Sequence, residues 1–303
     1  MPDHPTNPSF DPNQIALCGS TFYPKWYRGK IQSVQHTDKV RGDLVLEFIR
    51  EAVKHSCHVV LVDGGSHPQF LEEIPHSPNL IFIKKKSPKR SPNRRLAIKE
   101  SSRIPEVKVI ILTEPEKVSL ITDCLEIFVE PVIKDKADVV IAKRNVELFK
   151  QTFPSYYYES EVEANALYNE YLRSHGLLEP NKELDIFFSP KAFRNDAKVI
   201  SVFMKRFRLK IGGFIVPRSY FDPEEISDTG FFPAVLALKK RLRVESVEIP
   251  FKYPLLQKEN EEIGDREFFL AKRRAQRLGL LVDLTHLLSY LEKNPGSRLK
   301  PLK

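Results

Sequence analysis

An α/β fold with a mostly parallel sheet is the fold class that the sequence predicts, and three observations support it. Apolar runs alternate with helical stretches through residues 14–145. The runs at 59–62, 80–83 and 109–112 are uninterrupted, as expected for strands buried on both faces of a sheet. A polar or charged residue follows each of these runs at once. Alternating strands and helices of this kind are typical of a parallel sheet covered by helices.

The first half of the chain contains five predicted strands with helices between them. The strands are expected at 15–17, 59–62, 80–83, 109–112 and 138–142. Apolar side chains recur at helical spacing over 43–55 and again from Ile121 to Val132. Ser91-Pro92 predicts the start of a third helix, because serine caps helix N-termini and proline is favoured in the first turn. No glycine-rich dinucleotide motif and no P-loop occurs, which argues against those two classes of protein.

The second half of the chain is less regular. The pattern predicts a helix from 159 to near Gly176, a strand at 184–188, a basic helix at 191–210, a Gly-Pro turn region, a helix at 231–241, a strand at 247–251 and a long terminal helix. The apolar end of that last helix could pack on its own domain or in a homodimer.

The formal net charge of the 303 residues is +8, and the excess is concentrated. Ten Lys or Arg residues between Lys84 and Lys108 face only Glu100 and Glu106. This asymmetry predicts an anionic partner, such as a phosphorylated small molecule, nucleic acid or a membrane surface. Nucleic acid is not expected, because the cluster has no interleaved aromatic residues. The three cysteines form no CxxC pair and no apolar run is long enough to span a membrane, so a cytoplasmic protein is expected.

Acidic residues follow two of the predicted strands and mark a candidate site. Asp63-Gly64-Gly65-Ser66 closes the second strand, and Glu114-Pro115-Glu116 closes the fourth. Open α/β sheets bind ligands outside the carboxyl ends of their strands, and glycine allows a ligand to approach the backbone closely. The plainer interpretation of the second motif is an acidic loop that favours the dipole of the following helix.

These motifs resemble those of the nucleotide-sugar glycosyltransferases of the GT-A fold, particularly family-2-like members such as dolichyl-phosphate mannose and mannosylglycerate synthases. Asp63-Gly64-Gly65-Ser66 is similar to the family's Asp-Asp-Gly-Ser, whose first acid binds the donor base. Arg94-Arg95 resembles the segment that reaches the donor phosphates, and Glu114-Pro115-Glu116 stands where the family has its Asp-X-Asp metal motif. The resemblance extends over residues 14–145.

The resemblance implies a GT-A-like single domain with a Rossmann-like central sheet. Its parts would be a flexible tail (1–13), a nucleotide-sugar-binding half (14–145), an acceptor-side half (146–262) and a C-terminal helix and tail (263–303). The implied activity is transfer of a hexose, with mannose or glucose favoured, from a nucleotide-diphosphate sugar such as GDP-mannose or UDP-glucose to a hydroxyl acceptor.

The resemblance also assigns roles to individual residues. Donor binding falls to Ser20, Asp63, Gly64, Arg94, Arg95, Lys99 and Glu114. A divalent ion, Mn²⁺ or Mg²⁺, would be held by Glu114 and Glu116, since these hard cations accept carboxylate ligands. Asp185 is expected on the acceptor side, and Asp228 and then Glu163 are the candidates for catalytic base if the reaction inverts configuration.

Two departures from the family pattern leave alternatives open. Glutamates replace both aspartates of the metal motif, and Gly64 replaces the second acid of the base-binding motif. An inactive relative that docks an anionic partner on its basic surface is therefore the main alternative. A sugar nucleotidylyltransferase ranks lower, because Cys18-Gly19-Ser20-Thr21 offers one glycine and no arginine after the first strand.

Overall fold

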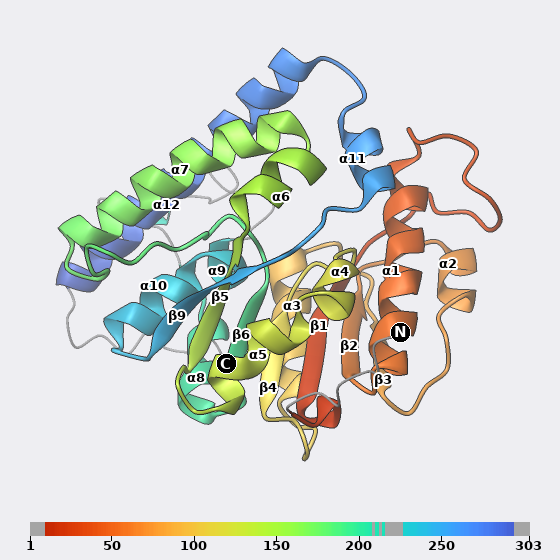
Figure 1. Ribbon diagram of the computed structural model, residues 1–303, viewed down its shortest axis with the longest axis horizontal. Coiled ribbons are helices and arrows are strands. Elements are labelled where there is room, and N and C mark those ends of the chain that lie inside the picture. The colour runs from red at the N-terminus through yellow and green to blue at the C-terminus, as the bar shows by residue number, and fades with distance from the viewer. Residues whose placement is uncertain (1–9, 208–209, 212–213, 216–226, 294–303) are drawn as a thin grey trace, which may run out of the picture.

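A seven-stranded sheet forms the centre of the protein (Figure 1). The computed structural model describes residues 10–207, 210–211, 214–215 and 227–293. The strands lie in the order β3-β2-β1-β4-β6-β5-β9, and all run in one direction except β6, which is antiparallel to both of its neighbours. Their bounds are β1 Ile15–Thr21, β2 His58–Asp63, β3 Leu80–Lys84, β4 Val109–Leu112, β5 Val139–Arg144, β6 Lys191–Arg194 and β9 Val244–Ile249. The predicted α/β class with a mostly parallel central sheet is confirmed.

Helices cover both faces of this sheet (Figure 1). They are α1 Thr37–Lys54, α2 Pro68–Glu72, α3 Arg90–Ser101, α4 Ser119–Thr122, α5 Leu125–Ile133, α6 Val146–Thr152, α7 Ser155–Ser174, α8 Ala197–Phe203, α9 Ser227–Gly230, α10 Phe232–Lys239, α11 Leu255–Glu261 and α12 Arg266–Lys293. A 3-10 turn (η1, Pro12–Gln14) precedes β1, and β7 (Lys210–Ile211) pairs with β8 (Phe214–Ile215) apart from the main sheet.

Successive residues of the strands enter two separate hydrophobic cores. In β1, Ile15 and Leu17 pack with α1 and α5, whereas Ala16 and Cys18 pack with α3, α8 and α10. The residues of β2 and β4 alternate in the same way. Because side chains on both faces are buried, the middle positions of β2 and all of β4 are apolar, and this explains the runs at 59–62 and 109–112. Strand β3 lies at the edge of the sheet and is only partly buried.

The first half has the five predicted strands, but several elements differ from the prediction. Strand β1 continues to Thr21, four residues past its expected end, and α1 begins at Thr37, six residues before its expected start. One helix was expected from Ile121 to Val132, but α4 and α5 divide it at Asp123 and Cys124. Ser91 is not an N-cap, because α3 begins at Arg90 and its cap is Lys89. The Ser91 hydroxyl instead lies 3.2 Å from that of Thr229. Residues 1–9 of the expected tail lie outside the described residues.

Two predictions in the second half are wrong. Residues 184–188 form turns rather than a strand, and the expected basic helix at 191–210 begins as strand β6 and continues as the short helix α8. Asp196 explains the change, because its carboxylate accepts hydrogen bonds from the backbone of Lys198 and Val199 and caps α8 there. The Gly-Pro turn region lies largely outside the described residues.

Helix α12 runs beside α7 and closes one side of the fold (Figure 1). Its apolar positions Leu280, Leu284, Leu287, Leu288 and Leu291 are buried in the core of its own chain, where Tyr168 of α7 also lies. The side chains that could have served a dimer therefore stabilise the monomer fold. Within the described part of the chain, no helix combines the length and the apolar character that crossing a membrane requires.

Candidate active site

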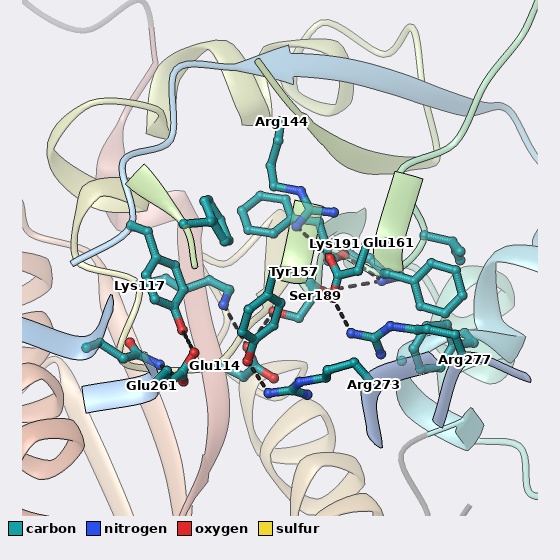
Figure 2. A pocket seen from close by; sticks show the side chains of 18 of the residues that line it. Glu114, Lys117, Arg144, Tyr157, Glu161, Ser189, Lys191, Glu261, Arg273 and Arg277 are labelled. Carbon is teal, nitrogen blue, oxygen red and sulfur yellow. Dashed lines mark hydrogen bonds and ion pairs between the residues drawn. The ribbon is translucent and has the colours of Figure 1, made fainter. Parts of the chain in front are cut away.

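A cavity of about 200 Å³ lies at the carboxyl ends of the parallel strands (Figure 2). Glu114 enters it from the loop after β4, and Arg144 from the last position of β5. Lys191 begins β6, whose antiparallel direction brings its first residue to the same edge of the sheet. The opposite wall comes from α7, α11 and α12. The cavity therefore lies between the two halves of the sequence.

A smaller hollow of about 50 Å³ adjoins this cavity. Ser20 and Thr21 at the end of β1 line it, together with Glu116. The two spaces share four wall residues, namely Arg41, Arg90, Arg94 and Glu114. An elongated ligand could therefore extend from one space into the other along a basic wall.

Positive charge dominates the larger cavity. Its lining includes eight cationic side chains: Arg41, Arg90, Arg94, Lys117, Arg144, Lys191, Arg273 and Arg277. Three carboxylates, those of Glu114, Glu161 and Glu261, share the same walls. Glu116 and Asp185 contribute two more from just behind the wall, so eight cations stand against five acids, an excess of three. Such a wall favours an anionic ligand.

Glu114 is held by cations on both of its oxygens. Its Oε2 lies 2.7 Å from Nζ of Lys117 and accepts a hydrogen bond of 3.1 Å from the hydroxyl of Ser189. Its Oε1 lies 3.7 Å from Nη2 of Arg94. Burial alone would raise the pKa of Glu114, but Lys117 and Arg94 outweigh it and hold the pKa well below its usual value.

Glu116 lines the smaller hollow but is almost fully buried, with 3% of its surface exposed. Its Oε1 lies 2.6 Å from Nη2 of Arg41 and accepts a 2.7 Å hydrogen bond from the hydroxyl of Tyr23. Its Oε2 has no hydrogen-bond partner. The Glu116 carboxylate raises the pKa of Arg41 well above its usual value, so this guanidinium stays charged on α1.

Arg144 is the centre of a buried ion-pair network. Its Nε and Nη2 each lie 2.7 Å from an oxygen of Asp185, and its Nη1 lies 2.7 Å from Oε2 of Glu161. Arg277 of α12 pairs with the other oxygen of Glu161. The guanidinium carbon of Arg144 is also 3.6 Å from the ring centre of Phe149. The network ties the end of β5 to α7 and α12 and fixes the far wall of the cavity.

Arg273 reaches the cavity one turn before Arg277 (Figure 2). It lies over the ring of Tyr157, 4.3 Å from the ring centre, and donates a hydrogen bond to that hydroxyl. Burial alone would lower the pKa of Arg273, but Tyr157 and Glu261 raise it overall. Arg273 therefore remains a cation within an aromatic wall.

Lys191 is buried at 1% exposure and lacks a short contact to a carboxylate among the described residues. Its ammonium donates hydrogen bonds of 3.3 Å to the backbone carbonyls of Phe188 and Ser189. Burial, reinforced by the charge of Arg94, lowers the pKa of Lys191 to about 7. The side chain can therefore gain a proton near neutral pH when an anion enters the cavity.

Glu261 differs from the other two cavity acids. Its Oε2 accepts a 2.9 Å hydrogen bond from Tyr253 and its Oε1 a 3.1 Å hydrogen bond from Gln257, both neutral donors. Glu114 and Glu161, by contrast, are paired with arginine or lysine. The hydrogen bonds to the Glu261 carboxylate therefore come from neutral groups, and its charge also raises the pKa of Arg273.

The structure places Ser20 and Gly64 beside the smaller hollow. Ser20 lines it, and a Cβ on Gly64 would meet the backbone oxygen of Ser87 at 2.8 Å, so glycine here lets the loop at 87–88 close over the site. Asp63 is 1% exposed and accepts hydrogen bonds from Thr21, Gly65 and Ser66. Its carboxylate shapes the loop around the hollow and does not line the hollow itself.

The arginines predicted for donor binding separate from one another on α3. Arg94 lines both spaces, whereas Arg95 turns to Asp228, 3.5 Å away. Lys99 is exposed nearer the other end of the helix and lines neither space. The three residues therefore do not act as one phosphate-binding group.

The residues predicted for the acceptor side and for the base lie outside the cavity lining. Asp185 is the partner of Arg144. Asp228 accepts a 3.2 Å hydrogen bond from the backbone of Phe207 and is 7% exposed. Glu163 lies on the outer surface of α7, 3.7 Å from Arg274. The cavity contains Glu161 of the same helix instead.

The sequence does contain signals for some of the cavity residues that were not assigned. Glu161 is in phase with the apolar positions Ala164 and Tyr168, three and seven residues later, and so lies on the buried face of α7. Arg273 and Arg277 are four residues apart and share one face of α12. A charged residue in phase with an apolar stripe is expected to be buried and paired.

A divalent ion fits these residues poorly. Three of the four oxygens of Glu114 and Glu116 are within 4 Å of a lysine or arginine nitrogen, which leaves Oε2 of Glu116. In the described ranges, no three His, Cys, Asp or Glu side chains gather as a metal site. An ion at Glu116 would stand next to the guanidinium of Arg41, and like charges repel.

Comparison with known proteins gives distant structural matches. No protein-family model and no curated protein matches the sequence. Glucosyl-3-phosphoglycerate synthase from Mycobacterium tuberculosis, solved with phosphoglyceric acid, is similar at 10% identity and a TM-score of 0.41, over 89% of this chain and 79% of that one. A protein assigned as a nucleotide-diphospho-sugar transferase from Desulfovibrio desulfuricans is similar at 12% identity and a TM-score of 0.38, over 92% and 98%. Likenesses this distant do not identify a family or an activity.

Proposed function

We propose that the protein is a nucleotide-sugar-dependent glycosyltransferase. It would move a hexose, with mannose or glucose favoured, from a nucleoside-diphosphate sugar to a hydroxyl acceptor. The observation that carries this proposal is the cation-lined cavity at the carboxyl ends of the parallel strands, joined to a second hollow through Arg41, Arg90 and Arg94. A diphosphate with a group at each end matches two spaces that share a basic wall.

The donor is expected to lie along this wall. Its diphosphate would contact Arg41 and Arg94, and its nucleoside would extend towards the hollow lined by Ser20 and Thr21. The sugar would then enter the larger cavity, where Tyr157 and Tyr253 supply ring faces and hydroxyl groups. The sheet and helices α1 and α3 fix the positions of these side chains, so the side chains need to move little when the ligand binds.

The chemistry requires one bond to break and one to form at the anomeric carbon. The bond from this carbon to the diphosphate oxygen breaks, and the electron pair leaves with the diphosphate. The acceptor oxygen bonds to the same carbon, and its proton passes to a carboxylate if configuration inverts. Cations already in place around the leaving group lower the energy of the charge that develops there.

Glu261 is the carboxylate that we propose for this proton transfer. It lines the cavity and receives hydrogen bonds from the neutral groups of Tyr253 and Gln257. Lys117 and Arg94 lower the pKa of Glu114 and make it a weaker base. Both oxygens of Glu161 are engaged by Arg144 and Arg277. Asp228 and Glu163, the candidates taken from the sequence, do not line the cavity.

Burial of the arginines weakens the proposal of a surface that docks an anionic partner. The side chains of Arg94 and Arg95 are 7% and 8% exposed, so they face the interior and not a partner surface. The exposed cations of that segment are Lys84, Lys85, Lys86, Lys89, Lys99, Arg103 and Lys108, and none of them lines the cavity. A polyanion bound there would respond steeply to salt, because many counterions would be released.

The proposal is tested by thermal unfolding in the presence of UDP, GDP, ADP and their sugar derivatives. Ligand at 100 times its dissociation constant stabilises the native state by about 2.7 kcal/mol, which is a measurable rise in Tm. Each ligand is measured with EDTA and with Mn²⁺. One nucleotide should raise Tm above the others, and nucleoside diphosphate should be released from its sugar derivative. No shift with any ligand under either condition would refute the proposal.

A further inference from the structure

This inference rests on the proposed function and concerns how the diphosphate is held. We propose that the cavity binds the diphosphate without a divalent metal ion, and that Arg41, Arg94 and Lys117 take the place of the ion. Glu114 and Glu116 then serve as the partners of these cations at the boundary between the two spaces until a diphosphate binds.

The balance of charge is the first step. A nucleotide sugar carries two negative charges on its diphosphate. Eight cations stand against five acids around the cavity, and the excess is still two if Lys191 is neutral. The protein alone therefore neutralises the ligand. A divalent ion would add two further positive charges to a wall that already has enough.

The second step is the state of the two glutamates. Lys117 lies 2.7 Å from Glu114, and Arg41 lies 2.6 Å from Glu116. For Mg²⁺ or Mn²⁺ to bind, these cations must leave their carboxylates. Lys117 is 10% exposed and would then be a buried charge without compensation, which is costly. A diphosphate, in contrast, can bind with the cations close to their present positions.

The third step is the position of the three cations. Lys117 lies beside the rings of Phe188 and Phe251, with its ammonium 5.4 Å and 5.9 Å from their centres. Arg41 and Arg94 line both spaces, so their guanidinium groups stand at the junction. Arginine forks bind two phosphate oxygens at once. The three side chains come from α1, α3 and the loop after β4, and the charges of all three act on the carboxylate of Glu114.

A variant of Glu114 separates the two models, because they predict opposite effects. If Glu114 holds a metal ion, Glu114→Gln should abolish nucleotide binding. If Glu114 competes with the diphosphate for Lys117 and Arg94, the same change should leave the affinity for UDP or GDP unchanged or increase it by up to about tenfold, in the range of one charged hydrogen bond. Glu114 is one-third exposed, so the fold should tolerate the change. Glu130→Gln, which alters a surface Glu-Lys pair on α5, is the matched control.

The experiment is isothermal titration of UDP and GDP into the full chain, in EDTA and in Mn²⁺. The inference expects dissociation constants within twofold of each other in the two buffers. Lys117→Met should weaken binding in EDTA by about tenfold, as loss of a charged contact predicts, with Arg41→Met as a second variant if that protein does not fold. Arg103→Met, at an exposed Arg-Glu pair, should bind as the wild type does.

The outcomes distinguish this inference from the proposed function. Binding in Mn²⁺ that is lost in EDTA, together with loss of binding in Glu114→Gln, would overturn the inference and leave the glycosyltransferase proposal in place. No binding of either nucleotide in any buffer would overturn both. Equal binding in both buffers with retained affinity in Glu114→Gln supports both.

Discussion

Replacing Lys191 by methionine should make the protein more stable at neutral pH and change how its stability depends on pH. Methionine is similar to lysine in length but carries no charge. Lys191 is buried, and its amine contacts backbone carbonyls at 3.3 Å. Burial and the nearby charge of Arg94 lower its pKa from 10.5 to about 7, which means that the folded state disfavours the charged amine.

The size of the effect follows from that change in pKa. One pKa unit corresponds to about 1.36 kcal/mol. The fall from 10.5 to about 7 therefore means that a charged Lys191 lowers the free energy of unfolding by at most ~5 kcal/mol. The cost is absent above pH 10.5, grows as the pH falls towards 7, and is complete below pH 7. Loss of the two hydrogen bonds in the variant works against this gain by about 1–3 kcal/mol at every pH. The variant should thus be the more stable protein at pH 6.5 and the less stable one at pH 10.5.

Urea unfolding of both proteins at intervals from pH 6.5 to 10.5 measures this difference. The single tryptophan, Trp26, is 3% exposed and reports unfolding by its fluorescence. Other groups that titrate in this range are common to both proteins and cancel in the difference. Lys54→Met, at an exposed lysine, should follow the wild type throughout. A difference between wild type and Lys191→Met that stays constant across the whole pH range would refute the reasoning.

Three further predictions concern the site. Asp185→Asn should lower the unfolding free energy by about 3–5 kcal/mol in urea titrations, because it leaves the buried charge of Arg144 without its main partner. An unchanged unfolding free energy would contradict the role of this ion-pair network in stability. Gly64→Ala should lower the free energy of unfolding by about 1–3 kcal/mol and weaken nucleotide binding, because the added Cβ would meet the backbone oxygen of Ser87 at 2.8 Å. Unchanged stability and unchanged nucleotide affinity would mean that the loop at 87–88 moves aside easily. Glu261→Gln should lower kcat about 10²–10⁴-fold while the nucleotide dissociation constant stays the same. A fall in kcat accompanied by an equal weakening of nucleotide binding would show a binding role instead.

Most strands of the sheet could be predicted because burial on two faces leaves a plain signal. The runs at 59–62, 80–83 and 109–112 each appear as strands within one residue of their expected ends. Strand β6 could not be predicted in the same way. It has four residues, begins with Lys191 and ends with Arg194, and it owes its conformation to pairing with β4 and β5, which are distant in the sequence. Tertiary contacts decide such a segment more than local propensity does.

The candidate site was only partly accessible from the sequence for a related reason. The rule that ligands lie at the carboxyl ends of parallel strands directs attention to Glu114 and Arg94, and both line the two spaces. Glu163, a predicted base, and Glu161, which lines the cavity, differ in their rotational position on α7. Two residues along a helix change the direction of a side chain by about 200°. Arg273 comes from α12, more than 150 residues after β4, and no local pattern places it at this edge of the sheet.

The position of β6 also has a consequence for how the chain folds as it is made. Strands β1 to β4 can pair with one another early, but the outer side of β4 and the whole of β5 find their partners only when residues 191–194 and 244–249 emerge. At about 5–20 residues per second, the roughly 80 residues between β4 and β6 take on the order of 4–16 seconds to synthesise. During that interval an apolar edge of the half-built sheet is exposed to other nascent chains. Faster translation should shorten this exposure, and a chaperone that covers extended apolar segments should raise the yield of folded protein.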